Sequence, residues 1–279
     1  MASVLITGAS SGIGAACVRR LDALGHEVFA GVRRSTDAER LTAERSERVV
    51  PVILDVTDEG SIAGVAEVVA ERRNGRGLDG LVNNAGIAVS GPVEFLPLER
   101  WREQFEVNVL GQVAMVKAFT QQVRAARGRI VFVGSMAGRI ATPFGAPYGS
   151  SKHAVAGVVE SLREELRPWH IRVSLVEPGA VATPIWTRGI GAYDRLAELI
   201  GPRGVELYGE RLRALEEQVA EIPGRAPTPA RAVSAIEHAL FAPRPRLRYA
   251  AGADARVVAA LLRALPDTAM AAIVRRTGP

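Results

Sequence analysis

The chain has 279 residues, of which 48% are hydrophobic and 23% charged, a composition that fits a globular protein and excludes a disordered or fibrous one. Its formal net charge of +5 comes from arginines scattered along the sequence, a distribution that does not indicate nucleic-acid binding. A single cysteine fits a reducing compartment, and without a signal-peptide pattern or an apolar run of about 18 residues we expect a cytoplasmic protein with no stable membrane insertion.

Short apolar runs alternate with longer amphipathic stretches along most of the chain. The predicted strands are Ser3–Thr7, Glu27–Val32, Val49–Leu54, Gly80–Asn83, Arg129–Val133 and Arg172–Glu177, with a last one near Arg246–Ala250. The predicted helices are Ile13–Leu24, Ile62–Arg72, Trp101–Ala126 and Ala154–Arg167. Strands rich in Val, Ile and Leu that alternate with helices favour a parallel sheet covered on both faces. Right-handed crossovers then give one doubly wound α/β domain, a Rossmann fold, over residues 1–279.

The pattern loosens after Pro184. Residues 184–225 carry helical patches that are broken at glycines, namely at Gly189, Gly191, Gly201-Pro202 and Gly204. The stretch Ala255–Arg276 has the pattern of an amphipathic helix interrupted at Pro266. We therefore expect a helical insertion over residues 184–223 and a C-terminal helical tail over residues 255–279.

A glycine-rich turn joins the first strand to the first helix. It is Thr7-Gly8-Ala9-Ser10-Ser11-Gly12-Ile13-Gly14. Glycines let the backbone approach a pyrophosphate, and the N-terminus of the helix offers free N–H groups and a positive dipole end. A plain strand–helix turn needs about one glycine, and three at this spacing exceed that requirement.

A tyrosine and a lysine lie four residues apart at the head of a predicted helix, as Tyr148-Gly149-Ser150-Ser151-Lys152. Residues at this spacing share one helical face, and an ammonium beside a phenol favours the phenolate and lowers its pKa. Ser150 and Ser151 have the character of residues at a helix start. Ser135 ends the fifth predicted strand, thirteen positions before Tyr148. Strand ends are where open α/β sheets bind ligands.

These motifs resemble the short-chain dehydrogenase/reductase family along about the first 185 residues. The resemblance implies an oxidoreductase that interconverts a secondary alcohol and a ketone by hydride transfer with a nicotinamide dinucleotide. Ser135 would bind the substrate oxygen and Tyr148 would exchange the proton. Lys152 would hold the ribose and tune Tyr148, while Asn108 would hold a helix distortion and a water linked to Lys152.

The resemblance also implies the dinucleotide site. Asn83–Gly86 would support the sheet and the cofactor, Asp55 would contact the adenine edge, and Pro178-Gly179 with Thr183 would hold the nicotinamide end. Taken alone, Asp55 and Thr183 could equally be a loop acid and a helix cap. The full set is Gly8, Ser10, Ser11, Gly12, Ile13, Gly14, Arg33, Arg34, Asp55, Val56, Asn84, Ala85, Gly86, Tyr148, Lys152, Pro178, Gly179, Val181 and Thr183.

The end of the second strand bears on the choice of cofactor. An acid there accepts hydrogen bonds from the ribose 2′-OH and favours NAD(H). By the family pattern Val32 takes the acidic position, and Arg33 and Arg34 follow it. An arginine can pair with a 2′-phosphate, so we expect NADP(H) rather than NAD(H). The alternative is that both arginines are merely solvated.

The residues of Glu160–Trp169 and Val176–Gly179 resemble those of the family branch that includes retinol, steroid and hydroxybutyrate dehydrogenases. The resemblance implies that residues 184–223 cover the substrate. Their apolar side chains suggest an apolar or bulky small molecule (a steroid, retinoid, lipid or polyketide-like compound), unless they bury themselves against the domain. It also implies a homodimer or homotetramer paired through the helices of Trp101–Ala126 and Ala154–Arg167.

The same motifs bear on two other functions. A non-catalytic NADP(H)-sensing regulatory protein would tend to keep the glycine loop and lose the Tyr148/Lys152 pair, and both are present. A sugar-nucleotide epimerase or dehydratase needs a larger C-terminal substrate domain than the residues after Thr183 allow. No metal site is predicted, because the four histidines show no ligand spacing.

Overall fold

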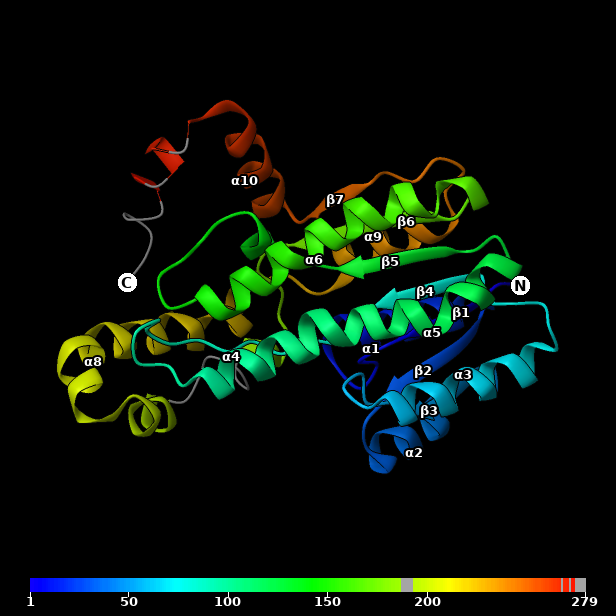
Figure 1. Ribbon diagram of the computed structural model, residues 1–279, viewed down its shortest axis with the longest axis horizontal. Coiled ribbons are helices and arrows are strands. Elements are labelled where there is room, and N and C mark those ends of the chain that lie inside the picture. Colours follow the sequence, from blue (N-terminus) through cyan, green and yellow to red (C-terminus); the bar gives the residue numbers. More distant parts are fainter. Residues whose placement is uncertain (187–192, 267, 271, 274–279) are drawn as a thin grey trace.

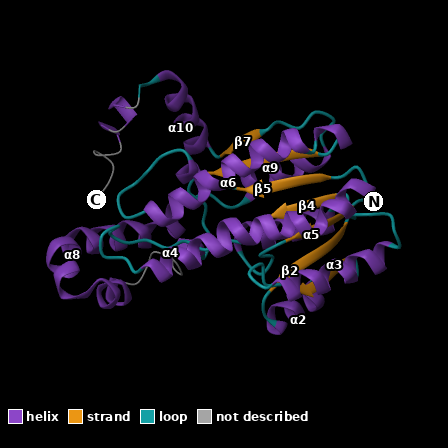
Figure 2. Ribbon diagram, viewed as in Figure 1, coloured by secondary structure: helices purple, strands orange, loops and turns teal. Residues whose placement is uncertain are grey.

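The computed structural model of the protein describes residues 1–186, 193–266, 268–270 and 272–273. Within these residues, seven strands form one parallel sheet in the order β3-β2-β1-β4-β5-β6-β7, with helices on both faces (Figures 1 and 2). The strands are β1 Ser3–Ile6, β2 Glu27–Val32, β3 Val49–Ile53, β4 Gly80–Asn83, β5 Arg129–Val133, β6 Arg172–Pro178 and β7 Arg248–Ala251. The prediction of a doubly wound α/β fold is confirmed.

The helices are α1 Gly12–Ala23, α2 Ser35–Glu44, α3 Glu59–Arg73, α4 Leu98–Phe105, α5 Gly111–Ala125, α6 Ala146–Glu165, α8 Tyr193–Arg225, α9 Ala230–Phe241 and α10 Ala253–Ala264. A π-helical turn, Glu106–Leu110, joins α4 to α5, and short 3₁₀ turns lie at Met136–Gly138 and Arg167–Trp169.

Alternation along the strands divides the core between the two faces of the sheet. In β1, Leu5 packs into a cluster with the inner sides of α3, α5 and α6, whereas Val4 and Ile6 pack into a cluster with α1 and α9. Successive side chains of a strand point to opposite faces, so a strand buried on both sides must be apolar throughout. Phe119 of α5 and Phe132 of β5, both fully buried, fill the first cluster.

Several predicted boundaries are corrected. Helices α2 and α9 were not predicted. The stretch Trp101–Ala126 is not one α-helix, because the π turn divides it. The breaks expected at Gly189 and Gly191 lie outside the described residues. Helix α8 bends at Gly201, whose φ is +68°, and then continues through Gly204. The tail helix α10 ends at Ala264, and the end predicted at Arg276 lies outside the described residues.

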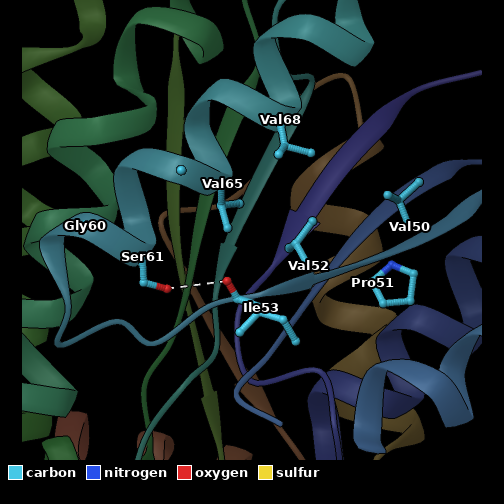
Figure 3. A pocket seen from close by; sticks show the side chains of 9 residues that line it. Val50, Pro51, Val52, Ile53, Gly60, Ser61, Val65 and Val68 are labelled. Carbon is cyan, nitrogen blue, oxygen red and sulfur yellow. Dashed lines mark hydrogen bonds between the residues drawn. The ribbon is translucent and has the colours of Figure 1, made fainter. Parts of the chain in front are cut away.

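The outer edge of β3 borders an open groove of about 570 Å³ against α3 (Figure 3). Leu54 donates its N–H to Val32 of β2, so the alternate residues Pro51 and Ile53 turn their backbone N atoms outward. Proline has no N–H to offer, which blocks pairing with another strand at this edge. The Ser61 hydroxyl also covers the edge, donating to the Ile53 carbonyl oxygen over 3.4 Å.

The parallel sheet brings the carboxyl ends of all its strands to one edge, where the functional residues gather. The loops after β1, β4, β5 and β6 meet there, which is the position at which open α/β sheets bind ligands. Among the described residues, no helix has both the length and the apolar character that crossing a bilayer requires.

Candidate active site

The glycine loop folds tightly against β4. Gly8 and Gly12 have φ values of +66° and +56°, a region that favours glycine. A Cβ on Gly14 would lie 2.2 Å from the Gly8 carbonyl oxygen, so any side chain there would push α1 off the loop. Ser11 precedes α1, and its side chain does not cap the helix. The loop therefore presents backbone N–H groups at close range, as a bound pyrophosphate requires.

Thr7 and Asn84 tie this loop to the segment after β4. The Thr7 hydroxyl accepts hydrogen bonds from the backbone N–H of Asn84 over 2.9 Å and of Ala85 over 2.8 Å. The Asn84 amide donates to the carbonyl oxygens of Thr7 over 2.9 Å and Gly8 over 3.2 Å. These contacts join Asn84 and Ala85 of the predicted set to the glycine loop. Thr7 is a supporting residue that the sequence analysis did not identify.

The end of β2 carries a cluster of charged side chains. Arg33 and Arg34 are exposed, and Arg34 Nε lies 2.9 Å from the Asp37 carboxylate. Arg40 of α2 also pairs with Asp37 over 3.2 Å, and it donates to the Ser10 carbonyl oxygen over 2.7 Å. Arg40 thus lies against the glycine loop, although the sequence analysis missed it, because α2 was not predicted.

Asp55 follows β3 at the same edge. Burial alone would raise the pKa of its carboxyl, but hydrogen bonds from the Thr57 N–H and hydroxyl, together with the charge of Arg33, lower it. The two bonds from Thr57 to Asp55 Oδ1 are 2.9 and 2.7 Å long. Val56, the next residue, packs against α5, since a Cβ on Gly111 would lie 2.8 Å from its carbonyl oxygen.

Asn108 lies in the π turn and is completely buried. Its Oδ1 accepts from the Ile87 N–H over 2.9 Å, and its Nδ2 donates to the Ile87 carbonyl oxygen over 3.0 Å. The same Nδ2 lies 3.1 Å from the Ser151 hydroxyl, which donates to the Tyr148 carbonyl oxygen over 2.7 Å. The extra residue of the π turn aims this side chain at two neighbouring elements. Such turns occur frequently at functional sites.

Ser151 corrects a sequence-based interpretation. Helix α6 begins at Ala146, so Ser150 and Ser151 lie within the helix and not at its start. Ser151 is fully buried, and its hydroxyl connects Asn108 to the backbone of Tyr148. A pattern of small polar residues near a helix start resembles a cap, and only the packing against the π turn reveals this second role.

Tyr148, Lys152 and Ser135 converge at the carboxyl end of β5. Lys152 is 4% exposed, and its Nζ donates to the Val133 carbonyl oxygen over 2.9 Å. The same Nζ lies 5.7 Å from the centre of the Tyr148 ring. A Cβ on Gly86 would lie 3.7 Å from Lys152 Nζ, so the segment after β4 forms the opposite wall.

Burial controls the titration of this pair. It lowers the pKa of Lys152 from 10.5 to about 8, because a cation is costly to remove from water. It raises the pKa of Tyr148, and a hydrogen bond from the Ser135 hydroxyl opposes that rise. Desolvation has the larger effect, so in the protein chain by itself the pKa of Tyr148 lies above its ordinary value and not below it, as the Tyr148/Lys152 spacing alone would lead one to expect.

The segment after β6 lies against the glycine loop. A Cβ on Gly12 would lie 3.1 Å from Thr183 Cγ2, so these two predicted residues face each other. The Trp186 indole donates to the Val181 carbonyl oxygen over 2.7 Å and braces the turn. The structure thus brings Gly12 and Thr183 together, Val181 lies two residues before Thr183, and Pro178 ends the strand that leads into this segment.

A buried carboxylate links three elements behind this segment. The Glu177 side chain is 1% exposed, and its Oε1 accepts from Arg139 Nε and from Arg248 Nη1, each over 2.7 Å. Arg248 of β7 also donates to Glu160 of α6 over 2.7 Å. Because Arg139 follows the turn that begins at Ser135, the network joins that turn to β7 and α6.

Apolar side chains of α8 gather beside the crevice. Ile200 and Leu212 are buried against Phe144, and the rings of Phe144 and Tyr208 lie 5.9 Å apart, edge to face. The Tyr208 hydroxyl donates to Glu94 over 2.8 Å, which ties α8 to the segment after β4. Part of the apolar surface of residues 184–223 is therefore buried against the domain. Among the described residues, no three His, Cys, Asp or Glu side chains could together hold a metal ion.

Comparisons with known proteins show which proteins this chain resembles. Residues 2–190 match the family model described as short chain dehydrogenase. The chain is 36% identical to human (Homo sapiens) retinol dehydrogenase 16 and 38% identical to bovine (Bos taurus) 17-beta-hydroxysteroid dehydrogenase type 6, in each case over 99% of this chain and 88% of the relative.

Two solved structures are similar to the chain over nearly its whole length. A short-chain dehydrogenase from Streptomyces avermitilis is 31% identical and superimposes with a TM-score of 0.77, covering 98% of this chain and 96% of that one. A short chain dehydrogenase from Burkholderia cenocepacia J2315, solved in complex with NADP, is 26% identical with a TM-score of 0.74, covering 100% of this chain and 98% of that one.

The low pKa of Lys152 predicts a pH-dependent stability difference. Between pH 8 and 10.5 the unfolded chain holds a proton on Lys152 that the folded chain has released, so folding is favoured as the pH rises. Relative to Lys152→Met, the wild type should gain up to about 3 kcal/mol across this window, which corresponds to several degrees in Tm. Thermal unfolding of both proteins without nucleotide, at pH 7 and at pH 10.5, measures the change.

The exposed Lys117 provides the matched control. The Tm difference between wild type and Lys117→Met should stay constant over the same pH range. A Tm difference for Lys152→Met that is equally independent of pH would contradict the burial argument.

Proposed function

Because the chain belongs to the short-chain dehydrogenase/reductase family, we propose that it is an NADP(H)-dependent oxidoreductase that interconverts a secondary alcohol and a ketone. The observation that carries the proposal is the convergence of Tyr148, Lys152 and Ser135 at the end of β5, braced from behind by Asn108. A tyrosine and a lysine close together on one helix, facing a serine at a strand end, form an acid/base group next to an oxygen-binding hydroxyl.

The chain offers a cradle that fits a dinucleotide. Gly8, Gly12 and Gly14 leave no side chain between the loop and a pyrophosphate, and the uncapped start of α1 provides N–H donors. The segment from Gly179 to Thr183 lies on the other side of the crevice and would hold the nicotinamide end. When bound, the dinucleotide supplies the hydride for reduction or accepts it in oxidation.

The side chains handle the proton and the oxygen. In reduction, the Tyr148 hydroxyl donates its proton to the carbonyl oxygen, and the Ser135 hydroxyl donates a hydrogen bond that stabilises the charge developing there. Lys152 holds a positive charge close to the ring of Tyr148, where it favours the phenolate that proton donation leaves behind. Asn108 keeps Ser151, and through it the backbone of Tyr148, in place.

NADP(H) preference is part of the proposal. No carboxylate takes the position of Val32, whereas Arg33, Arg34 and Arg40 gather beside the glycine loop. Asp37 balances one of these charges, because it pairs with both Arg34 and Arg40, and Asp55 offsets part of the charge of Arg33. The remaining positive charge favours a ligand that carries a 2′-phosphate, and exposed arginines can turn toward it at little cost.

The proposed substrate is an apolar or bulky small molecule, such as a steroid, a retinoid, a lipid or a polyketide-like compound. The side chains of α8 and Phe144 support this class, since they form an apolar wall next to the crevice. Two similar proteins carry names that refer to retinol and to a 17-beta-hydroxysteroid, which are compounds of this kind. Residues 184–223 would cover such a molecule.

Replacing Tyr148 by Phe tests the mechanism. The variant keeps the ring but lacks the proton donor, so kcat for ketone reduction should fall by at least about 100-fold while the Kd for NADPH stays within about threefold. NADPH oxidation with a panel of ketones, steroids, retinoids and polyketide-like carbonyls provides the assay.

The control is Tyr249→Phe in β7, which removes a hydroxyl that contacts His238 of α9 and accepts from the Arg246 N–H, away from the end of β5. Its kcat should remain close to that of the wild type. A Tyr148→Phe protein with near-native kcat would rule out this acid/base assignment, and a wild type that turns over no carbonyl would favour a regulatory role instead.

Cofactor kinetics test the role of the arginines. The wild type should show a higher kcat/KM with NADPH than with NADH, and Arg33→Ala should lower the NADPH value by roughly tenfold or more with little effect on the NADH value. Arg19→Ala, which removes an exposed arginine from α1, is the control. Higher kcat/KM with NADH in the wild type would show that the preference is assigned wrongly.

Assembly into a homodimer or homotetramer through α5 and α6 belongs to the same proposal. Light scattering of the purified chain should give a mass of two or four copies, and a monomer at all concentrations would refute it.

A further inference from the structure

Helix α10 packs against the turn that holds Ser135. Ala255 and Ala259 are buried on the inner side of the helix and contact Met136, the residue after Ser135. The helix follows β7 directly and lies at the carboxyl end of the sheet (Figure 1). The C-terminal part of the chain therefore forms the back of the catalytic turn.

The same helix holds the loop on the other side of the crevice. Asp254, in its first turn, accepts a hydrogen bond from the Ala180 N–H over 2.9 Å, across 74 positions of sequence. A Cβ on Gly179 would lie 1.9 Å from Asp254 Oδ2, so the carboxylate fills the space that a side chain would need. The backbone N–H of Gly179 itself donates to the Ala251 carbonyl oxygen over a longer distance, 3.4 Å.

We propose that Asp254 is a positioning residue: it fixes the backbone of Gly179 and Ala180 relative to Ser135, so that the two walls of the crevice keep their separation. This inference rests on the proposed oxidoreductase function, in which Gly179 borders the nicotinamide end. Asp254 reaches the loop from the same helix that buttresses Met136, so one rigid element sets the position of both walls.

A local explanation of the carboxylate is insufficient. An acid in the first turn of a helix is favoured by the helix dipole, but Asp254 directs its oxygen to the loop after β6. Gly252, the residue before the helix, has no side chain that could cap the helix N-terminus. Asp254 therefore has no capping partner there. Gly179 and Gly252 both lack a side chain where the carboxylate lies, since a Cβ would come within 1.9 Å of Oδ2 at Gly179 and within 2.4 Å of Oδ1 at Gly252.

The consequence for catalysis is geometric. A shift of about 1 Å in a positioning element can cost up to about a hundredfold in rate, because the reacting atoms must stay in near-contact. Loss of the Asp254 acceptor should therefore lower kcat more than it weakens nucleotide binding, since the pyrophosphate contacts lie in the separate glycine loop.

The test uses four variants of the full chain: Asp254→Ala, Asp254→Asn, Gly179→Ala and the double variant Gly179→Ala/Asp254→Ala. Asp254→Ala should lower kcat roughly ten- to hundredfold. Asp254→Asn keeps an oxygen that can accept from Ala180 and should retain kcat within about threefold of the wild type. Arg263→Ala, an exposed residue of the same helix, is the control.

The double variant separates positioning from general destabilisation. Gly179→Ala alone forces its methyl group into the carboxylate and should lower kcat. Removing the carboxylate in the double variant frees that space, so its kcat should exceed that of Gly179→Ala. Additive losses in the two single variants, or native kcat in Asp254→Ala, would overturn the proposal.

Amide hydrogen exchange provides a readout that does not require turnover. Peptides covering residues 178–186 should exchange faster in Asp254→Ala than in the wild type, Asp254→Asn or Arg263→Ala, because the Ala180 N–H loses its acceptor. Unchanged exchange would refute the role of Asp254 even if the protein reduced no carbonyl. A chain without activity but with the expected exchange pattern would refute the proposed function and leave the positioning contact established.

Discussion

The hydrogen bond from the buried Lys152 ammonium to the Val133 carbonyl oxygen fixes α6 to the end of β5, and the arrangement of the site follows from it. Withdrawing an ammonium from water costs several kcal/mol, so this side chain stays buried only because the surrounding elements are held rigidly. Gly86 leaves room for the charged head, and Gly138 leaves room for the backbone of the same residue. With Lys152 anchored in this way, Tyr148 one helical turn earlier has one position against Ser135.

Most of the fold is contained in local patterns. The six main predicted strands agree with the structure to within one residue at each end, because strands buried on both faces form unbroken apolar runs. Helices α2 and α9 were missed. Although α9 is well buried, no glycine-rich motif marks it, and the stretch before it shows no clear hydrophobic periodicity. The π turn could not be derived from periodicity, since one extra residue in a helix changes neither its composition nor its polarity.

The part of the site that was missed depends on contacts between distant residues. Arg139 and Glu177 lie 38 positions apart, and Asp254 and Ala180 lie 74 apart, so nothing in either neighbourhood marks the pairing. Arg40 was missed for a related reason, because it reaches Ser10 only once α2 has folded back along β2. The motif residues Gly12, Tyr148 and Lys152 occur in short fixed spacings, which the sequence displays directly. The sequence therefore predicts the groups that would touch the ligands better than the groups that hold them in place.

The network around Glu177 has a consequence for how such sequences can diverge. Removing this carboxylate alone would leave Arg139 and Arg248 facing each other without their shared counter-ion, whereas removing one arginine would still leave the other in place. Replacing one arginine should therefore destabilise the fold less than replacing Glu177, because Glu177 then keeps the other arginine as its partner. Substitutions in this network should therefore accumulate in a preferred order. Random mutant libraries screened for folding should recover substitutions of either arginine more readily than substitutions of Glu177.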